Sequence, residues 1–216
     1  DGMAGRDANA ATNSNTDGKL GFSFTSVPAA GSDPGGCVQD NVTGLMWEVK
    51  TTDGGLRDWT KTYTNYDSTL LAQKSGGTAP TQSEIDAPTN SVGFKNAVNA
   101  QSLCGFSDWR LPTADELQSI VDYGVAYPGP TIDASWFPNT QGSAFWSASP
   151  VVGNSNSAWG VNFNVGYVGN YYRYYSYYVR LVRAGQPLTT PRYTISTDGQ
   201  EVTDNQTKLI WRRCAE

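Results

Sequence analysis

The 216-residue chain offers few residues for acid–base chemistry. It contains no histidine, which removes Ser-His and Cys-His catalytic groups and the commonest general base. Asp115, Glu116, Asp122 and Asp133 lie close enough in sequence to suggest glycoside hydrolysis by two carboxylates. However, Asp115 and Glu116 follow Thr113 in the pattern of a helix-capping box, which gives both a structural role. The sequence therefore predicts that the protein is not an enzyme and uses no cofactor.

Three cysteines, Cys37, Cys104 and Cys214, are too few and too scattered for a zinc site, so no metal site is predicted. Their number fits one disulfide and one remaining thiol. We predict the pair Cys37–Cys104, because each lies in a segment that looks ordered. The alternative is three reduced, buried thiols.

A tyrosine-rich segment is the strongest candidate for a binding surface. Seven of the twelve tyrosines lie between residues 167 and 178. A strand that buried all of them would leave many hydroxyls in need of partners, so some must be exposed. Exposed Tyr, mixed with Ser, Gly and Asn, is typical of antibody paratopes. The alternative is a structural Tyr ladder packed on Arg173 and a neighbouring domain. The predicted ligand-binding residues are Asn154, Asn156, Gly160, Asn162, Tyr167, Asn170, Tyr171, Tyr172, Tyr174, Tyr175 and Tyr177.

Charge and hydropathy exclude other classes of partner. The net charge is −5, which disfavours binding to nucleic acid and to anionic membrane surfaces. No run of about 18 apolar residues is present, so we expect no membrane insertion. Only 16% of the residues are charged, while Gly, Asn, Ser, Thr and Tyr are abundant. This composition favours short strands joined by long polar loops.

The elements that would position this surface alternate between helical and strand periodicity. One helix is predicted from Ser91 to about Leu103, and a second from the Thr113 cap to Gly124. Residues 50–90 are expected to be mostly loop. Alternating apolar residues predict strands at 20–24, 144–149, 158–165 and 178–183, with a turn at Gly166. The prediction is an α+β fold with two helices, small antiparallel sheets and much irregular loop.

An internal repeat divides the chain. Val38–Trp47 recurs as Val202–Trp211 at an offset of 164 residues, with six of ten positions identical. We expect the second copy to be the start of a second domain; the alternative is a closing strand of the first domain. The predicted parts are an N-terminal extension (1–36), one domain (37–186) and a C-terminal segment (187–216).

Four segments resemble one known family: Asp40–Thr51, Leu103–Thr113, Phe145–Ser149 and Tyr178–Arg183. They are similar to the Lcl C-terminal domain family, over roughly residues 20–184. The resemblance implies a C-type lectin-like fold and a secreted, periplasmic or bacterial cell-surface location. Members are similar to the variable proteins of diversity-generating retroelements, and residues 157–167 look like such a variable region.

The function expected from these observations is extracellular binding of a protein or glycan ligand on another cell or surface. The alternative is a structural or adhesin module of a cell-surface assembly, for which an oligomer would be compatible with the sequence. Binding of a glycosaminoglycan would need a basic patch. The residues available for one are Arg173, Arg180, Arg183, Lys208, Arg212 and Arg213.

Overall fold

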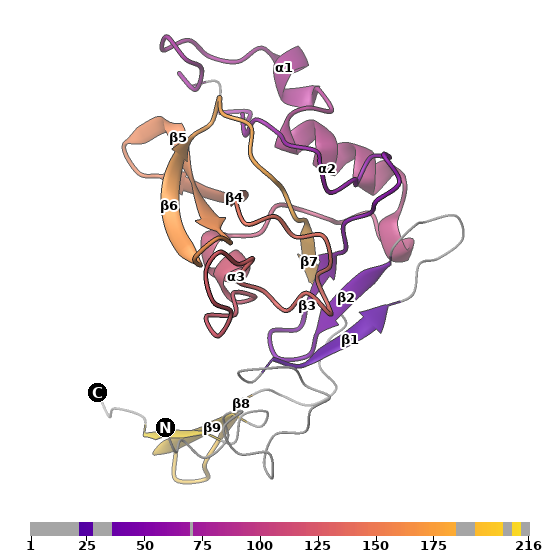
Figure 1. The fold of residues 1–216 in the computed structure, drawn as a ribbon. Helices are drawn as coiled ribbons and strands as arrows, with labels where there is room; N and C mark the ends of the chain where they lie inside the picture. The colour runs from indigo at the N-terminus through magenta and orange to yellow at the C-terminus, as the bar shows by residue number, and fades with distance from the viewer. Residues whose placement is uncertain (1–21, 28–35, 70, 185–192, 205–208, 213–216) are drawn as a thin grey trace.

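The computed structural model describes residues 22–27, 36–69, 71–184, 193–204 and 209–212 (Figure 1). Short helices, small antiparallel sheets and long loops make up this part of the chain, so the predicted α+β fold is confirmed. None of the helices in these residues has the length and apolar character needed to cross a membrane.

Residues 22–184 form the main domain, and the first sheet joins strands from near its two ends. Its strand order is β1-β2-β3-β7, and all neighbours are antiparallel. The strands are β1 (Phe24–Val27), β2 (Cys37–Asp40), β3 (Leu45–Glu48) and β7 (Val182–Ala184). Asp40 closes the turn between β2 and β3, since its Oδ1 accepts the Val42 N–H at 2.8 Å and its Oδ2 accepts the Thr43 hydroxyl at 2.6 Å. Because β1 pairs with β2, the predicted N-terminal extension contains a strand of the domain.

The second sheet is an antiparallel meander of β4 (Ala144–Val151), β5 (Asn154–Asn162) and β6 (Tyr167–Tyr172). The chain turns at Gly166, as predicted, with a φ of 72°. The strand that returns from this turn is β6, and the prediction that 178–183 returns here was wrong. Residues 182–184 form β7, which pairs with β3 instead, and Val182 lies opposite Trp47.

The helices are shorter than the sequence suggested. They are α1 (Gln82–Asp86), α2 (Ser91–Ala100), a 3-10 turn at Leu103–Gly105, and α3 (Ala114–Gln118). Helix α1 was not predicted. Helix α2 ends before Leu103 because Ser102 and Cys104 adopt left-handed conformations, with φ of 52° and 54°. Helix α3 ends at Gln118 and not at Gly124, and beyond it the Asp122 N–H donates to the Thr131 carbonyl of a distant segment.

The predicted capping box is present at α3. The Thr113 hydroxyl accepts the Glu116 N–H, and the Glu116 carboxylate accepts the Thr113 N–H at 2.8 Å. A second capping box, between Thr81 and Glu84, starts α1. Both boxes satisfy amide groups that the first helical turn leaves without partners.

Two apolar clusters form the core, and the β4–β6 sheet lies between them. Phe145 and Val161 belong to one cluster, while their neighbours Trp146 and Ala158 belong to the other. Successive residues of a strand point to opposite faces, so both faces of this sheet are packed near its centre. The Cys37–Cys104 disulfide, as predicted, ties β2 to the 3-10 turn. The sheet that carries the tyrosines thus has core residues on both of its faces.

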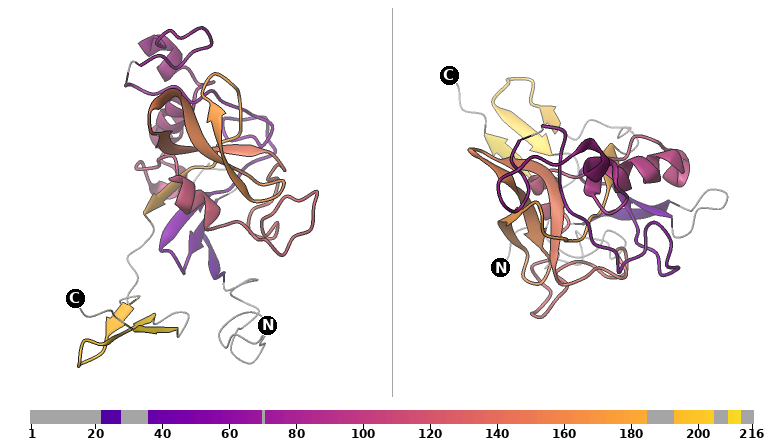
Figure 2. Two further views of the ribbon diagram at one scale, coloured as in Figure 1. Left: turned by 90° about the vertical axis from the view of Figure 1, so that its left-hand side faces the viewer. Right: turned by 90° about the horizontal axis from the view of Figure 1, so that it is seen from above.

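A third sheet, of order β10-β9-β8, follows the main domain. Its strands are β8 (Tyr193–Ile195), β9 (Glu201–Asp204) and β10 (Ile210–Arg212). Figures 1 and 2 show it beyond β1–β3, at the opposite end of the molecule from α1. The described strands of this sheet pair only with one another. Cys214, for which no partner was predicted, lies outside the described residues.

Candidate functional site

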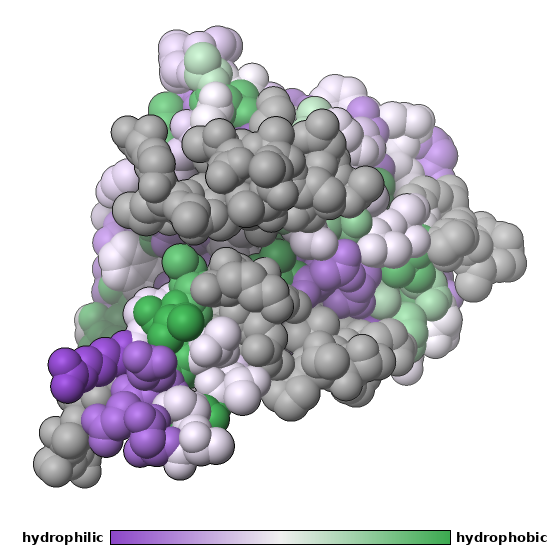
Figure 3. All heavy atoms as spheres, turned by 90° about the horizontal axis from the view of Figure 1, so that it is seen from below, coloured by the Kyte–Doolittle hydropathy of each residue, from purple (hydrophilic) through white to green (hydrophobic). Residues whose placement is uncertain are grey.

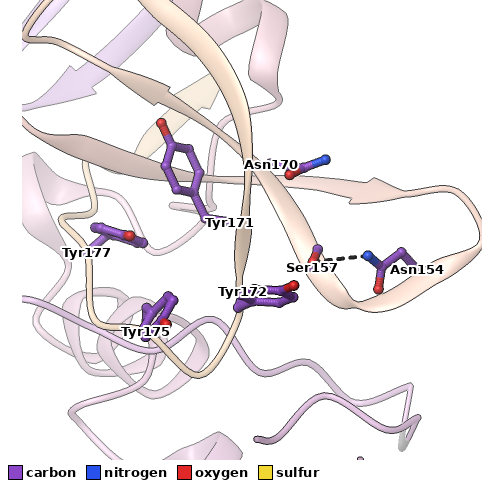
Figure 4. Close-up of a pocket in the computed structure, with 7 residues that line it drawn as sticks. All are labelled: Asn154, Ser157, Asn170, Tyr171, Tyr172, Tyr175 and Tyr177. Atoms are coloured by element: carbon purple, nitrogen blue, oxygen red, sulfur yellow. Dashed lines mark hydrogen bonds between the residues drawn. The ribbon is translucent and has the colours of Figure 1, made fainter.

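Six of the predicted binding residues line one hollow at the free edge of β6 (Figure 4). The hollow has a volume of about 200 Å³. Its lining comes from the start of β5, from the end of β6 and from the segment after β6. The lining residues are Asn154, Ser157, Asn170, Tyr171, Tyr172, Tyr175 and Tyr177. Of these only Ser157 was not predicted; its hydroxyl lies 3.3 Å from the Asn154 amide nitrogen, which donates to it.

The tyrosine rings form a continuous series from the core to the surface. Tyr171 and Tyr177 each make an edge contact with buried Trp146, at centroid distances of 6.1 and 5.3 Å, and lie 5.0 Å from each other. Tyr175 lies 6.3 Å from Tyr177 and 6.1 Å from Tyr172. Tyr172 and Tyr175 are exposed. Because each ring packs on the next, the exposed rings are presented in a fixed arrangement, which limits the entropy lost on binding.

No charged side chain lines this hollow. Burial raises the pKa of the Tyr171 and Tyr177 hydroxyls above the ordinary value of 10.0. Both hydroxyls therefore stay protonated at neutral pH and can donate as well as accept hydrogen bonds. Together with the Asn154 and Asn170 amides, they suit a neutral ligand that has hydroxyl or amide groups and an apolar face.

Arg173 fixes the turn that follows β6. Its side chain is buried; Nη1 donates to the Asn65 carbonyl at 2.7 Å and lies 3.0 Å from an Asp67 carboxylate oxygen. Its backbone N–H donates to the Asn156 carbonyl at 2.8 Å. Arg173 thus binds the turn to the 65–67 loop and to β5. These contacts hold the adjacent residue Tyr172 in place.

The other five predicted residues do not line the hollow. Tyr174 stacks on Tyr172 at 5.2 Å, and Tyr167 is exposed further along β6. Asn156 accepts the Ser157 hydroxyl through its own side chain at 3.0 Å. Asn162 accepts the Asn164 N–H at 2.9 Å and so shapes the β5–β6 turn. Gly160 is buried.

Gly160 has a structural role that sequence composition did not reveal. It lies opposite Gly169 of β6, and the Tyr171 ring covers this pair of glycines. A methyl group at Gly160 would lie 2.6 Å from the Phe145 carbonyl oxygen and 3.2 Å from the Tyr171 ring. The absence of a side chain at Gly160 therefore lets Tyr171 lie against the sheet.

Gly160→Ala is expected to lower the free energy of unfolding by about 1–3 kcal/mol, because the added methyl meets backbone that cannot move away. Gly169→Ala is the matched control, since its methyl would meet the ring of exposed Tyr167, which can rotate. Chemical denaturation of the two variants checks this. Equal stability losses would contradict the role given to Gly160.

A second hollow, of about 340 Å³, adjoins the first and shares Asn154 with it. It lies between the β4–β5 hairpin and the loop that contains Asp67, and the Ser155 hydroxyl donates to the Ala72 carbonyl at 3.0 Å across this junction. This second hollow could not be predicted from local sequence patterns, because the loop and the hairpin are about 80 residues apart. Its lining residues are Asp67, Thr69, Leu71, Pro150, Val151, Gly153, Asn154, Ser155 and Arg173.

The charged motif Asp108-Trp109-Arg110 is structural. Trp109 is buried, and its indole N–H donates to the Leu103 carbonyl at 3.0 Å. Arg110 makes two hydrogen bonds to the Glu116 carboxylate, at 2.6 and 2.7 Å. Arg183 lies 2.6 Å from an Asp108 carboxylate oxygen and holds the pKa of that carboxyl below its usual value. Glu116 is thus occupied by Arg110 as well as by the capping box.

The arginines considered for a polyanion site do not form an accessible basic surface in the described residues. Arg173, Arg180 and Arg183 are all buried. Arg180 donates to the Glu48 carbonyl at 2.6 Å and to the Thr140 hydroxyl at 2.7 Å. Arg212 is exposed on β10, and Lys208 and Arg213 lie outside the described residues. Glycosaminoglycan binding therefore lacks three of its six candidate residues.

Comparison with known proteins agrees with the motifs. A search of curated proteins found no match. The sequence model of the Lcl C-terminal domain matches residues 36–183, which is more than half of the chain and contains all of β2–β6, the three helices and the tyrosine-lined hollow. On this match, the chain belongs to the Lcl C-terminal domain family.

Proposed function

We propose that this protein binds a neutral protein or glycan ligand outside the cell, through the hollow lined by Asn154, Asn170 and four tyrosines. The observation that carries the proposal is the exposure of Tyr172 and Tyr175 on a fixed series of rings beside uncharged amides. Rigid exposed tyrosines supply a large contact area at low entropic cost, and the amides supply adaptable hydrogen bonds. Such a mixture is typical of recognition surfaces.

The disulfide supports the proposed location outside the cell, and the composition of the hollow supports binding and not catalysis. Disulfides persist in secreted, periplasmic and cell-surface proteins, which supports an extracellular or periplasmic location. The chain has no histidine and the hollow has no ionisable acid or base of ordinary pKa near neutrality, which supports a binding role and not catalysis.

The proposal includes a C-type lectin-like scaffold and a surface that varies between relatives. Its support is that the hollow is built from Tyr, Asn and Ser, and that Tyr172 and Tyr175 are exposed, so that substitutions at these two positions would disturb the core little. Buried Gly160 and the turn residue Asn162 would then be excluded from variation, although both were predicted as part of the surface. Sequencing the gene from many isolates tests this: variation confined to the lining residues supports it, and an invariant hollow contradicts it.

Replacing Tyr172 and Tyr175 by Ser is expected to weaken ligand binding by about 10-fold or more, because each replacement removes an exposed ring of the kind that dominates recognition surfaces. The measurement is a screen of the wild type and this double variant against arrays of surface proteins and glycans, followed by titration of the ligands found. Since both rings are exposed, the melting temperature is expected to change little.

Tyr127→Ser is the matched control, because Tyr127 is also exposed but does not line the hollow. Loss of binding in the double variant alone supports the proposal. Equal binding by all three proteins would place recognition elsewhere on the molecule.

A second candidate function, a structural or adhesin module of a surface assembly, is favoured by a different observation. The sheet β8–β10 carries exposed Ile195, Ile210 and Trp211. A set of large apolar side chains in one small sheet is typical of a surface that packs against another unit.

A further inference from the structure

The C-terminal sheet reproduces the first sheet in its strand register. Val202 lies opposite Trp211 as Val38 lies opposite Trp47, and Thr203 lies opposite Ile210 as Gln39 lies opposite Met46. Each residue of this second hairpin is 164 positions after its counterpart. The sequence repeat is therefore a structural repeat, strand for strand.

The repeat extends to a third strand that the sequence comparison did not detect. β8 pairs with β9 as β1 pairs with β2: Ile195 lies opposite Val202, and Ser26 lies opposite Val38. The connection before the hairpin is shorter in the second copy, with residues 196–200 in place of 28–36. Both copies are antiparallel meanders of the same order.

The two copies differ in what covers them. Trp47 is 0% exposed, whereas its counterpart Trp211 is 46% exposed. Met46 is buried and its counterpart Ile210 is exposed. Figure 3, which looks at the end of the molecule from which this sheet projects, shows green hydrophobic atoms at the surface beside purple hydrophilic ones. The second copy thus keeps the apolar residues of the first without the surroundings that bury them.

In the first copy, the outer edge of β3 is covered by β7. Trp47 lies opposite Val182, and the Glu48 N–H donates to the Leu181 carbonyl at 3.0 Å. Amide groups alternate in direction along an antiparallel strand, so the Met46 N–H also faces β7. By the 164-residue offset, the N–H groups of Ile210 and Arg212 face the outer edge of β10. Among the described residues, no strand pairs with this edge.

One substitution between the copies indicates the charge of the missing strand. Glu48 is replaced by Arg212 in the second copy. In the first copy, Arg180 donates to the Glu48 backbone carbonyl; burial lowers the pKa of this guanidinium, and the negative charge of Glu48 raises it. A strand placed against β10 would therefore be favoured by an acidic residue at the position that corresponds to Arg180.

We propose that β10 binds an antiparallel strand of the kind that β7 supplies to β3, contributed by a further copy of this fold and carrying an acidic residue near Arg212. The strand would complete the ladder at Ile210 and Arg212, and the domain that follows it would cover Trp211. The β8–β10 sheet is then the first sheet of a second, tandem domain, and a docking surface in its own right. This proposal does not depend on the ligand-binding hollow.

The test is an NMR titration of the full, ¹⁵N-labelled chain with two synthetic peptides. One has the sequence of residues Ser176–Ala184, and the other is the same peptide with Arg180→Glu. We expect amide shifts confined to residues 193–212, and about two- to fivefold tighter binding of the Glu peptide at low ionic strength, as for an exposed ion pair. The variant Ile210→Pro removes an N–H that faces the outer edge and not β9, so it is expected to abolish the shifts.

The variant Arg212→Glu keeps the test decisive if Ile210→Pro disrupts the hairpin. It is expected to reverse the preference, so that the unchanged peptide binds two- to fivefold more tightly than the Glu peptide. Absence of shifts with both peptides at millimolar concentration would overturn the proposal. So would a concentration-dependent dimer that Ile210→Pro dissociates, because the edge would then pair with a second copy of this chain itself.

Discussion

Glu48→Gln is expected to lower the free energy of unfolding by about 3–5 kcal/mol, the usual loss when one partner of a buried ion pair is removed. The Glu48 side chain is fully buried. Its Oε1 lies 2.8 Å from the Lys50 ammonium, and its Oε2 accepts the Leu181 N–H at 2.9 Å. Glutamine can accept only one of these two bonds, because its amide nitrogen would face a donor at the other. Guanidine denaturation monitored by Trp fluorescence measures the loss.

The charges around Glu48 explain why this effect is large. Lys50, Arg57 and Arg180 are all buried, and the charge of Glu48 favours the protonated forms of Lys50 and Arg180. Burial already lowers the pKa of Lys50 from 10.5, and burial lowers the pKa of Arg180 to about 10. Without Glu48, buried Lys50 and Arg180 would each lose the negative charge that favours its protonated form. Glu48 therefore permits β3 and the 180–182 segment to meet in the core.

The free energy of unfolding of Glu48→Gln should also depend on pH. In Glu48→Gln the pKa of Lys50 in the folded protein falls further, while in the unfolded chain it returns to about 10.5. The unfolded chain then binds the proton more tightly, so stability rises with pH up to that value. The difference in free energy of unfolding between the wild type and Glu48→Gln is thus expected to become smaller between pH 7 and pH 10. The double variant Glu48→Gln/Lys50→Met should recover part of the loss, and a double variant as unstable as the sum of the single ones would show that the two residues are not coupled.

Local signals in the sequence predicted local structure well. Thr113 and Glu116 start α3 as expected, because a capping box is formed by residues three apart and needs no distant partner. Thr81 and Glu84 have the same spacing, so α1 could have been predicted from the same signal.

The predictions were wrong where the structure depends on pairing between segments that are far apart in the sequence. Residues 178–183 alternate like a strand of the second sheet, yet Val182 exchanges backbone hydrogen bonds with Arg110 and lies opposite Trp47. Nothing near Val182 in sequence indicates either partner. The candidate site also has a part that was predictable and a part that was not. Because buried Tyr hydroxyls need hydrogen-bond partners, exposed tyrosines could be predicted. The burial of Gly160, by contrast, depends on a cross-strand neighbour that composition cannot identify.

A disulfide links β2 of the first sheet covalently to the 3-10 turn at Leu103–Gly105. Replacing Cys37 and Cys104 by Ala is expected to lower the free energy of unfolding by about 2–4 kcal/mol. The disulfide joins residues 67 positions apart, and without it the unfolded chain gains the freedom of that whole loop. Both cysteines belong to the core cluster that contains Trp146 and Ala158.

Two controls separate the cross-link from the packing of the cysteine side chains. Wild type treated with reductant keeps both side chains but loses the loop closure, so it should account for most of the loss seen in the double Ala variant. Cys214→Ala should leave the stability unchanged and remove the one thiol that remains when two of the three cysteines are paired. Titration of three free thiols in the unfolded, unreduced wild type would instead show that Cys37 and Cys104 are not joined, and that the first sheet is held to α2 by packing alone.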